Sequence, residues 1–563
     1  MRRQPDSSPF RTPARALALA MPALLAAWLV PPAQAASAQD IHPASHQAAA
    51  ADDLGTVDFR ASCAPGVQQD VDRAVALLHH MMYEQSRAAF EAVAQEDAGC
   101  AAAHWGAATT LFQPLWPARP DAETRQRGWG LVETARELGA ETDRERALLD
   151  ATAAFFEDPA DDAWWPRIER WAERLEAAHR AHPEDLEIAV FHGLGLLAAG
   201  QVAGDQLAYN ARAAEVLRGV HDREPLHPGA IHYTIHADDA TGRADTHLQV
   251  VEQYGEIAPM VPHALHMPSH IYVRLGEWPE VIEWNRRSAD AALDHPAGDR
   301  VSLHYVHALD YLLYAHLQRG DDEQAAAVLD EAFAAGTYQD DFASAFHLAV
   351  MPARKAVERR AWRDAARLES GVPDYLSWDR YLWPRAISWF ARGLGGAHTG
   401  DLAKAREAES AMTDLRRQAE DSGEQAFATY IEIDRLVLAG WIAHAEGNTE
   451  SAVRYMNEAA ELESGIEKHP ISPGSLHPPR EALGDLLMAH ERHAEARRAY
   501  EASLDAWPGR YNSLLGAARA ARADGDDEAA RTHYQALIDV VEDARRDRPG
   551  VREAASMLGI SGS

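Results

Sequence analysis

The chain repeats a pattern of residues at intervals of 34 positions, and this period restricts the fold more than any other feature of the sequence. The interval separates Gly242 from Gly276 and, near the C-terminus, Ala496 from Ala530. It also separates the members of two series in the middle of the chain: Ala213, His247 and Val281, and Leu217, Val251 and Asn285. A unit of this length buries its apolar face by stacking on its neighbours. The sequence therefore predicts an array of stacked repeats.

Each repeat is predicted to be a pair of helices. Residues that favour helices (Ala, Leu, Glu and Arg) dominate, and alternating runs of Val, Ile and Thr are scarce. Prolines, which cannot continue a helix, follow the second helix of three units at Pro225, Pro259 and Pro508. A helix-turn-helix unit of 34 residues resembles the tetratricopeptide repeat (TPR). We expect an all-α, irregular TPR-like solenoid, a superhelix with a concave groove.

The N-terminus has the features of an export signal. Arginines precede an apolar stretch at 16–30, and an Ala-x-Ala site ends at Ala35. We expect a signal peptide at 1–35 with cleavage after Ala35, a periplasmic protein, and a mature chain without a transmembrane segment. In an oxidising compartment the two cysteines, Cys63 and Cys100, could form one disulfide.

The rest of the chain is divided by composition and repeat spacing. Residues 36–56 read as a flexible leader, 57–335 as an N-terminal and central TPR-like array, 336–550 as a C-terminal array and 551–563 as a tail. The formal net charge of -33 would repel phosphate backbones, so nucleic acid is not an expected partner.

Several longer phrases resemble a family of bacterial exported TPR proteins. They are "LLHHMMYEQSRAAFEAVAQEDAGCAAAHWGAA", "HPGAIHYTIHADD", "PHALHMPSHIYVRLGEW", "HALDYLLYAHLQRGD" and "EKHPISPGSLHPPREALGDLL". The resemblance covers nearly the whole mature chain and implies the fold and the export. It implies no reaction and no catalytic residue.

Histidines gather in the centre of the chain, where twelve of the 28 lie between His221 and His316. If Gly242 and Gly276 mark the turns, two units begin at Pro228 and Pro262. In TPR units generally, the second, fifth and ninth residues face the groove. The predicted groove residues are His232, Tyr233, His236, His263, His266, His270, Tyr272, Arg274, His304, His307, Asp310 and Tyr314. Pro268 is expected to interrupt the second unit and to leave His263 and His266 in a loop.

Three interpretations of these histidines stay open. They are hydrogen-bonded packing residues, or they line a groove for a peptide, a protein partner or a small ligand, or they bind a transition metal such as Zn, Cu, Ni or Fe. The pool of metal ligands is His232, His236, His263, His266, His270 and His307. The leading prediction is a binding or scaffold protein, and the alternative is a metalloprotein. The chain lacks the HExxH, GxSxG and Walker motifs, so only a metal-dependent reaction is considered.

Overall fold

A computed structural model describes residues 53–116, 118–541 and 548–560. The predicted signal peptide at 1–35 lies outside the described residues, and so does the predicted leader apart from 53–56. All described residues belong to one compact unit.

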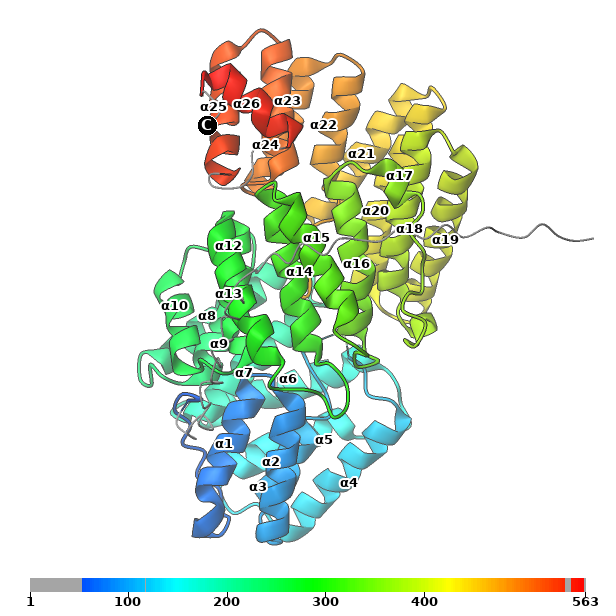
Figure 1. The fold of residues 1–563 in the computed structure, drawn as a ribbon. Coiled ribbons are helices and arrows are strands. Elements are labelled where there is room, and N and C mark those ends of the chain that lie inside the picture. The colour runs from blue at the N-terminus through cyan, green and yellow to red at the C-terminus, as the bar shows by residue number, and fades with distance from the viewer. Residues whose placement is uncertain (1–52, 117, 542–547, 561–563) are drawn as a thin grey trace, which may run out of the picture. The chain divides into compact units, whose positions relative to one another are not determined.

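The described residues confirm the all-α prediction, because they contain helices and only two isolated β-bridges, Ala297 with Arg300 and Val301 with Tyr338. The first half, drawn in blue to green in Figure 1, contains η1 Pro65–Val67, α1 Gln68–His79, α2 Tyr83–Glu96, α3 Ala101–Thr109, α4 Ala122–Leu138, α5 Asp143–Phe156, α6 Trp164–Ala181, α7 Leu186–Gly200, α8 Gln206–His221, α9 Pro228–Asp238, α10 Leu248–Ile257, α11 Pro262–His266, α12 Pro268–Leu275 and α13 Trp278–Ala292. The second half contains α14 Leu303–Gln318, α15 Asp322–Ala334, α16 Phe342–Glu358, α17 Trp362–Ala365, η2 Trp378–Arg380, α18 Leu382–Thr399, α19 Leu402–Asp421, α20 Gln425–Ala445, α21 Thr449–Ser464, α22 Pro479–Ala489, α23 His493–Ala506, α24 Tyr511–Ala523, α25 Asp527–Val541 and α26 Pro549–Leu558.

Successive helices pack on one another, as the repeat period predicts. The pairs α7 and α8, α13 and α14, α18 and α19, and α20 and α21 are examples. Gly242, Gly276 and Gly320 all have positive φ, between 71° and 76°, at the turns between helices. Residues one period apart are buried in equivalent places, for example Tyr500 in α23 and Tyr534 in α25. The helix-pair solenoid is therefore confirmed.

The structure corrects the expected loop before Pro268. His263 and His266 lie in α11, and Pro268 is the first residue of α12, with Met267 between them in helical conformation. Proline is tolerated at a first helical position because its missing N–H has no partner there in any case. The two short helices therefore carry their histidines in nearly helical register.

The predicted tail also differs from the structure. Residues 549–558 form α26, which packs on α25 and buries Val551 and Ala554. These apolar residues are three positions apart, so they share a helix face. Helix packing also continues across the expected boundary at 335 and 336, because α16 contacts both α14 and α15.

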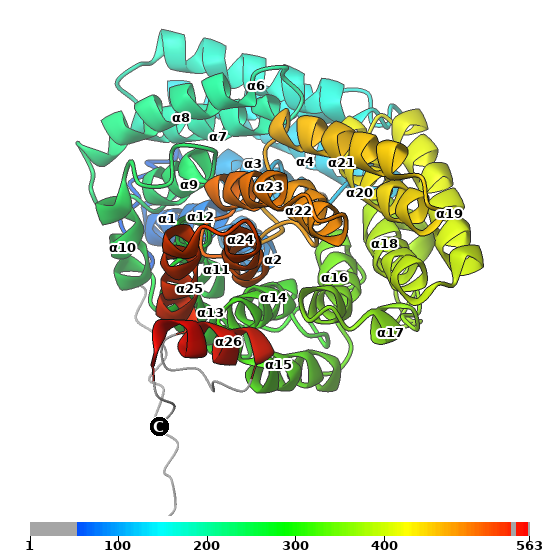
Figure 2. The same cartoon turned by 90° about the horizontal axis from the view of Figure 1, so that it is seen from above.

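The chain returns to its own middle after α21. Figure 2 shows successive helices following a curve, with α24 back against α14, and these two helices are in contact. The residues 465–478, here called the interior loop, connect α21 to α22. Tyr311 Oη in α14 donates to the carbonyl of Pro470 at 3.0 Å, and Arg354 in α16 donates to the carbonyl of Gly474 at 3.1 Å. The expected open groove is therefore filled by the interior loop at this level.

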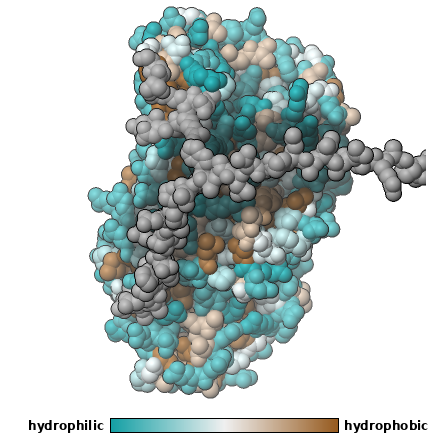
Figure 3. All heavy atoms as spheres, viewed as in Figure 1, coloured by the Kyte–Doolittle hydropathy of each residue, from teal (hydrophilic) through white to brown (hydrophobic). Residues whose placement is uncertain are grey.

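The face shown in Figure 3 is largely polar, with a few apolar residues near the middle of the view. Among the described residues, no helix combines the length and the apolar character needed to cross a membrane.

Candidate metal centre

The six histidines predicted as a ligand pool come together in two groups. His232 and His236 from α9 join His263 from α11, and His266 from α11 joins His270 from α12 and His307 from α14. We call them the first triad (His232, His236, His263) and the second triad (His266, His270, His307). Within each triad the potential ligand atoms lie within 4.8 Å of one another. Spacings of three and four residues place the histidines of one helix on the same face.

Most ring nitrogens of the first triad have no hydrogen-bond partner among the described residues. His232 Nδ1 donates to the carbonyl oxygen of His79 at 2.6 Å, which leaves a lone pair on Nε2. That Nε2 and both nitrogens of His236 and His263 are buried and have no hydrogen-bond partner among the described residues. Such orphaned groups are rare in folded proteins, because each loses its bonds to water without replacement.

In the second triad, two neighbours determine which nitrogen carries the proton. Asn285 Nδ2 donates to the carbonyl of Val281, so its Oδ1 accepts from His266 Nδ1 at 2.7 Å. Asp239 Oδ2, which accepts only, lies 2.8 Å from His270 Nδ1. In the neutral imidazoles both Nε2 atoms therefore carry lone pairs.

These two lone pairs face each other, since His266 Nε2 and His270 Nε2 are 2.9 Å apart. With no proton between them they repel, and a cation removes that repulsion. Two nitrogens at this separation can both lie about 2.0 to 2.1 Å from one ion, the usual bond length from zinc to histidine.

The third member of the second triad is oriented through a relay. Asp310 Oδ2 accepts from His347 Nδ1 at 3.1 Å, so His347 Nε2 can accept from His307 Nδ1 at 2.8 Å. His307 Nε2 then keeps its lone pair. Chains of carboxylate and imidazole behind a ligand are typical of metal sites, where they hold the ring and set its tautomer.

Burial keeps the histidines of both triads neutral. Their residues are between 0% and 8% exposed. Burial, followed by the neighbouring imidazole of His270, lowers the pKa of His236 to about 3. Burial and then His266 lower the pKa of His307 well below its usual value. Neutral imidazoles offer the lone pairs that metals bind.

The two triads border one small cavity of about 10 Å³. Its walls come from both triads, from the interior loop and from the segment after α3; the lining residues are Leu115, Trp116, His236, His263, His270, His307, His469, Pro470 and Ile471. This volume holds about one water molecule. The centre is therefore a small chamber lined by buried imidazoles and a few apolar side chains.

Other predicted groove residues do not line this chamber. Tyr233 packs behind it on His79, Tyr272 lies among the acidic side chains of α10 and α13, and Tyr314 bonds Arg510. Asp310 acts through His347, Arg274 pairs with Asp239, and His304 lies beside the first triad, 5.2 Å from His263 between ring centroids. The prediction of one continuous groove is corrected, because α14 turns Tyr311 rather than Tyr314 toward the histidines.

Sequence reasoning missed several residues of the centre. His347, Asn285 and Trp116 were not predicted, and His469 was not assigned to the groove. Asn285 belongs to a series with the 34-residue period, and His347 follows the start of its helix by almost the same distance as His307. Only Trp116 and His469, which lie in irregular segments, have no such signal.

Two other clusters contain residue types that bind metals, but their potential ligand atoms already form hydrogen bonds or a disulfide. His79 Nε2 and His227 Nε2 bond the two oxygens of Glu187 at 2.9 and 3.2 Å. Cys63 and Cys100, near Asp97, form a disulfide with their Cα atoms 4.6 Å apart. The unpaired nitrogens of the first triad distinguish it from these clusters.

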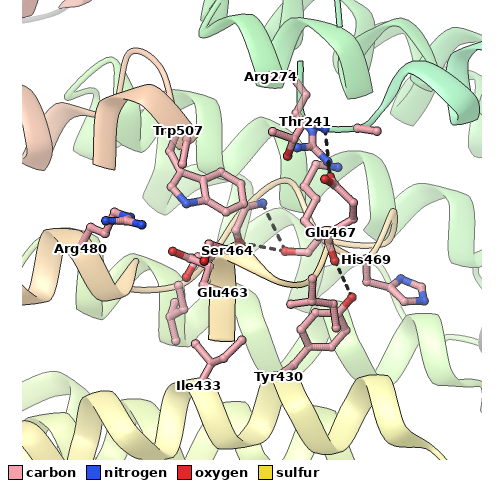
Figure 4. A pocket seen from close by; sticks show the side chains of 18 of the residues that line it. Thr241, Arg274, Tyr430, Ile433, Glu463, Ser464, Glu467, His469, Arg480 and Trp507 are labelled. Atoms are coloured by element: carbon pink, nitrogen blue, oxygen red, sulfur yellow. Dashed lines mark hydrogen bonds and ion pairs between the residues drawn. The ribbon is translucent and has the colours of Figure 1, made fainter. Parts of the chain in front are cut away.

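A much larger cavity, of about 670 Å³, lies next to the centre and shares His469 with it. Figure 4 shows Glu463, Ile433 and Trp507 on one side of this large cavity and Arg274, Glu467 and Tyr430 on the other. Arg274 and Glu467 form an ion pair at 3.0 Å. The volume is within the range of pockets for small molecules.

Comparisons with known proteins provide no functional assignment. No family model and no curated protein matches the chain. The human IFIT1 dimer with m7Gppp-AAAA is similar with a TM-score of 0.36 and 13% identity, over 79% of this chain and 90% of that chain. The APC/C hetero-tetramer Cut9-Hcn1 is similar with a TM-score of 0.32 and 12% identity, over 87% and 89%. These distant similarities indicate no ligand or partner, and the resemblance to an exported TPR family stays a prediction.

Proposed function

We propose that the protein binds two transition-metal ions, one at each histidine triad. The observation that carries this proposal is the set of buried imidazole nitrogens that have no hydrogen-bond partner or face another lone pair. A purely structural role leaves those nitrogens unsatisfied, and an unsatisfied buried polar group costs about 1–3 kcal/mol. A cation at the first triad would engage one unpartnered nitrogen of each of its three rings, and a cation at the second would remove the repulsion between His266 Nε2 and His270 Nε2.

The ligand chemistry selects the class of ion. All six proposed ligands are imidazole nitrogens, which suit Zn, Cu, Ni and Fe and do not suit Mg or Ca. Three protein ligands leave a fourth position at each ion for water or another small molecule. His236, His263, His270 and His307, which would hold the two ions, border one chamber, so water or a small molecule there could reach either ion.

The location of the protein is part of the same proposal. The basic and apolar N-terminus favours export, and the disulfide between Cys63 and Cys100 is compatible with an oxidising compartment. A second candidate function, binding of a small ligand by the solenoid, is favoured by the large cavity and is compatible with a metal centre beside it.

Elemental analysis of protein purified without a histidine tag tests the metal site. We expect two transition-metal ions per chain. His263→Phe should remove the ion of the first triad and His307→Phe that of the second, while each variant keeps the other ion. His192→Phe, at a buried histidine of α7 outside the centre, is the matched control and should keep both.

Thermal unfolding of the same proteins gives an independent measurement, which does not depend on how much metal the protein acquired before purification. A free ion at about 100 times its Kd stabilises a folded protein by about 2.7 kcal/mol per site. Chelation should therefore lower the melting temperature, and the ion should restore it. Protein that takes up no ion and melts at the same temperature with chelator and with added Zn²⁺, Cu²⁺, Ni²⁺ or Fe²⁺ contradicts the proposal.

A further inference from the structure

The large cavity has a charge pattern that the metal proposal does not use. At one end, Arg274 and Lys468 are neutralised, because both form ion pairs with Asp239 and Arg274 also pairs with Glu467. Positive charge at this end is therefore compensated within the protein.

At the other end, two partly buried carboxylates have no such compensation. Asp434 from α20 and Glu463 from α21 form no ion pair with any residue that the structure describes. Two cations act on Glu463: Arg480, at the start of α22 and drawn in Figure 4, and Arg510, which is already paired with Glu358 and Glu481. When the carboxylates are ionised, their negative charges outnumber the one guanidinium of Arg480, so a cation would be favoured at this end of the cavity.

Aromatic side chains line the same space. Trp383 and Tyr430 stack with their ring centroids 4.7 Å apart, and Trp507 lies on the same side of the cavity as Glu463 in Figure 4. Apolar side chains of Phe346, Val350, Ile387 and Leu476 complete the wall. Aromatic faces attract cations, and they attract organic cations most strongly where water is excluded. A hydrated metal ion gains little from such walls.

We infer that the large cavity binds a small organic cation, in which an ammonium group lies between Asp434 and Glu463 and an apolar body rests on the aromatic walls. The ammonium group supplies the missing positive charge, and the body fills a space of about 670 Å³. This inference goes beyond the proposed metal function and does not depend on it, because neither carboxylate belongs to a triad.

The protonation of the two carboxylates adds a pH dependence. Burial raises the pKa of Glu463 to about 7, and burial followed by the charge of Glu463 raises that of Asp434. The other groups that act on Glu463 are Trp507, Arg480, Arg510 and Glu481. Because a bound cation favours the ionised carboxylate, its binding should strengthen as the pH rises through about 7.

Calorimetric titration with three compounds of one size tests the inference on the full, metal-replete protein. The probes are 2-phenylethylammonium, the neutral 2-phenylethanol and the anionic phenylacetate. We expect the cation to bind at least tenfold more tightly than either of the others. Equal binding of the neutral compound, tighter binding of the anion, or failure of 2-phenylethylammonium to bind would overturn the inference.

Variants with opposite expected effects separate recognition from a loss of fold. Glu463→Gln and Asp434→Asn should each weaken binding of 2-phenylethylammonium at least tenfold, and Arg480→Gln should strengthen it. Glu461→Gln, on the exposed face of the same helix, is the matched control and should change nothing. If Glu463→Gln and Arg480→Gln shift the affinity in the same direction, the charge argument is wrong.

Discussion

At the scale of single residues, the neighbours of each imidazole decide which nitrogen is available to a metal. Asn285, Asp239 and the carbonyl of His79 each accept a hydrogen bond from an Nδ1–H group and leave Nε2 with its lone pair. A histidine elsewhere in the core, such as His79, uses both nitrogens in hydrogen bonds. The same residue type thus has a structural role in one place and a ligand-like role in another.

The relay behind His307 leads to a first prediction. His347→Phe keeps a buried aromatic ring but removes the acceptor of His307 Nδ1–H, so the ring of His307 loses its fixed tautomer. Loss of such a supporting group typically costs about 10–100-fold in metal affinity. Competition with a chelator should show weaker binding of the second-triad ion and unchanged binding of the first. If the variant binds both ions as tightly as the wild-type protein does, His347 has only a packing role.

Glu463 leads to a second prediction, on stability. The unfolded chain loses this proton near 4.5 and the folded protein near about 7, so stability falls as the pH rises between these values and stays reduced above them. Glu463→Gln removes the buried charge and should stabilise the ligand-free protein by about 1 kcal/mol or more near pH 8. Urea unfolding near pH 4 should show no gain. A gain of the same size at both pH values would exclude ionisation as its cause.

At the scale of elements, the turn glycines of successive repeats have different surroundings. Gly242 and Gly276 both have positive φ, of 71° and 76°. A Cβ atom on Gly242 would meet nothing within 4 Å, whereas one on Gly276 would lie 2.9 Å from the carbonyl oxygen of Pro508. The end of α12 therefore packs backbone to backbone on the turn between α23 and α24.

This difference provides a matched pair of variants. Gly242→Ala should cost about 1 kcal/mol, from the left-handed conformation alone. Gly276→Ala should cost that amount and about 1–3 kcal/mol more, because the added methyl forces the two backbones apart. Hydrogen exchange around α23 and α24 should rise only in the second variant. Equal behaviour of the two would mean that the turn at Pro508 moves freely.

At the scale of the whole molecule, contacts between distant repeats distinguish this array from one in which each unit touches only its neighbours. Arg510, which is 1% exposed, pairs with Glu358 at 2.7 Å and with Glu481 at 3.0 Å, and it donates to Tyr314 Oη. Trp278 Nε1 donates to the carbonyl of Gly509. These bonds join α13, α14 and α16 to α22 and to the turn before α24.

A last prediction concerns the cooperativity that these contacts create. Arg510→Met leaves the buried carboxylate of Glu358 without its cation, whereas Glu481 keeps Arg360, and the loss of one partner from a buried pair costs about 3–5 kcal/mol. We expect the wild-type protein to unfold in one transition. The variant should unfold in two, with α22–α26 opening first. A variant that still unfolds in one transition at the wild-type midpoint would mean that Arg510 does not couple these parts.

Much of the architecture could be predicted from residue spacing, because repeat periodicity is a local property. The glycines and prolines at repeat ends predicted the helix pairs, and the register that begins at Pro228 and Pro262 brought five of the six triad histidines into one region. Their burial was not predictable. Helical register predicts which face of a helix a side chain occupies. It does not predict which other part of the chain packs on that face and buries the side chain.

By itself, the sequence determined an all-helical repeat array with its histidines on adjacent helices. The tertiary structure alone decided that these histidines form two buried triads. It also decided that a separate cavity lies beside them, lined by carboxylates that form no ion pair with a described residue. The physical reason is distance along the chain. Lys468 pairs with Asp239, and His469 lies beside the triad histidines, both across about 200 positions of the chain. A local sequence pattern cannot predict contacts over such a separation.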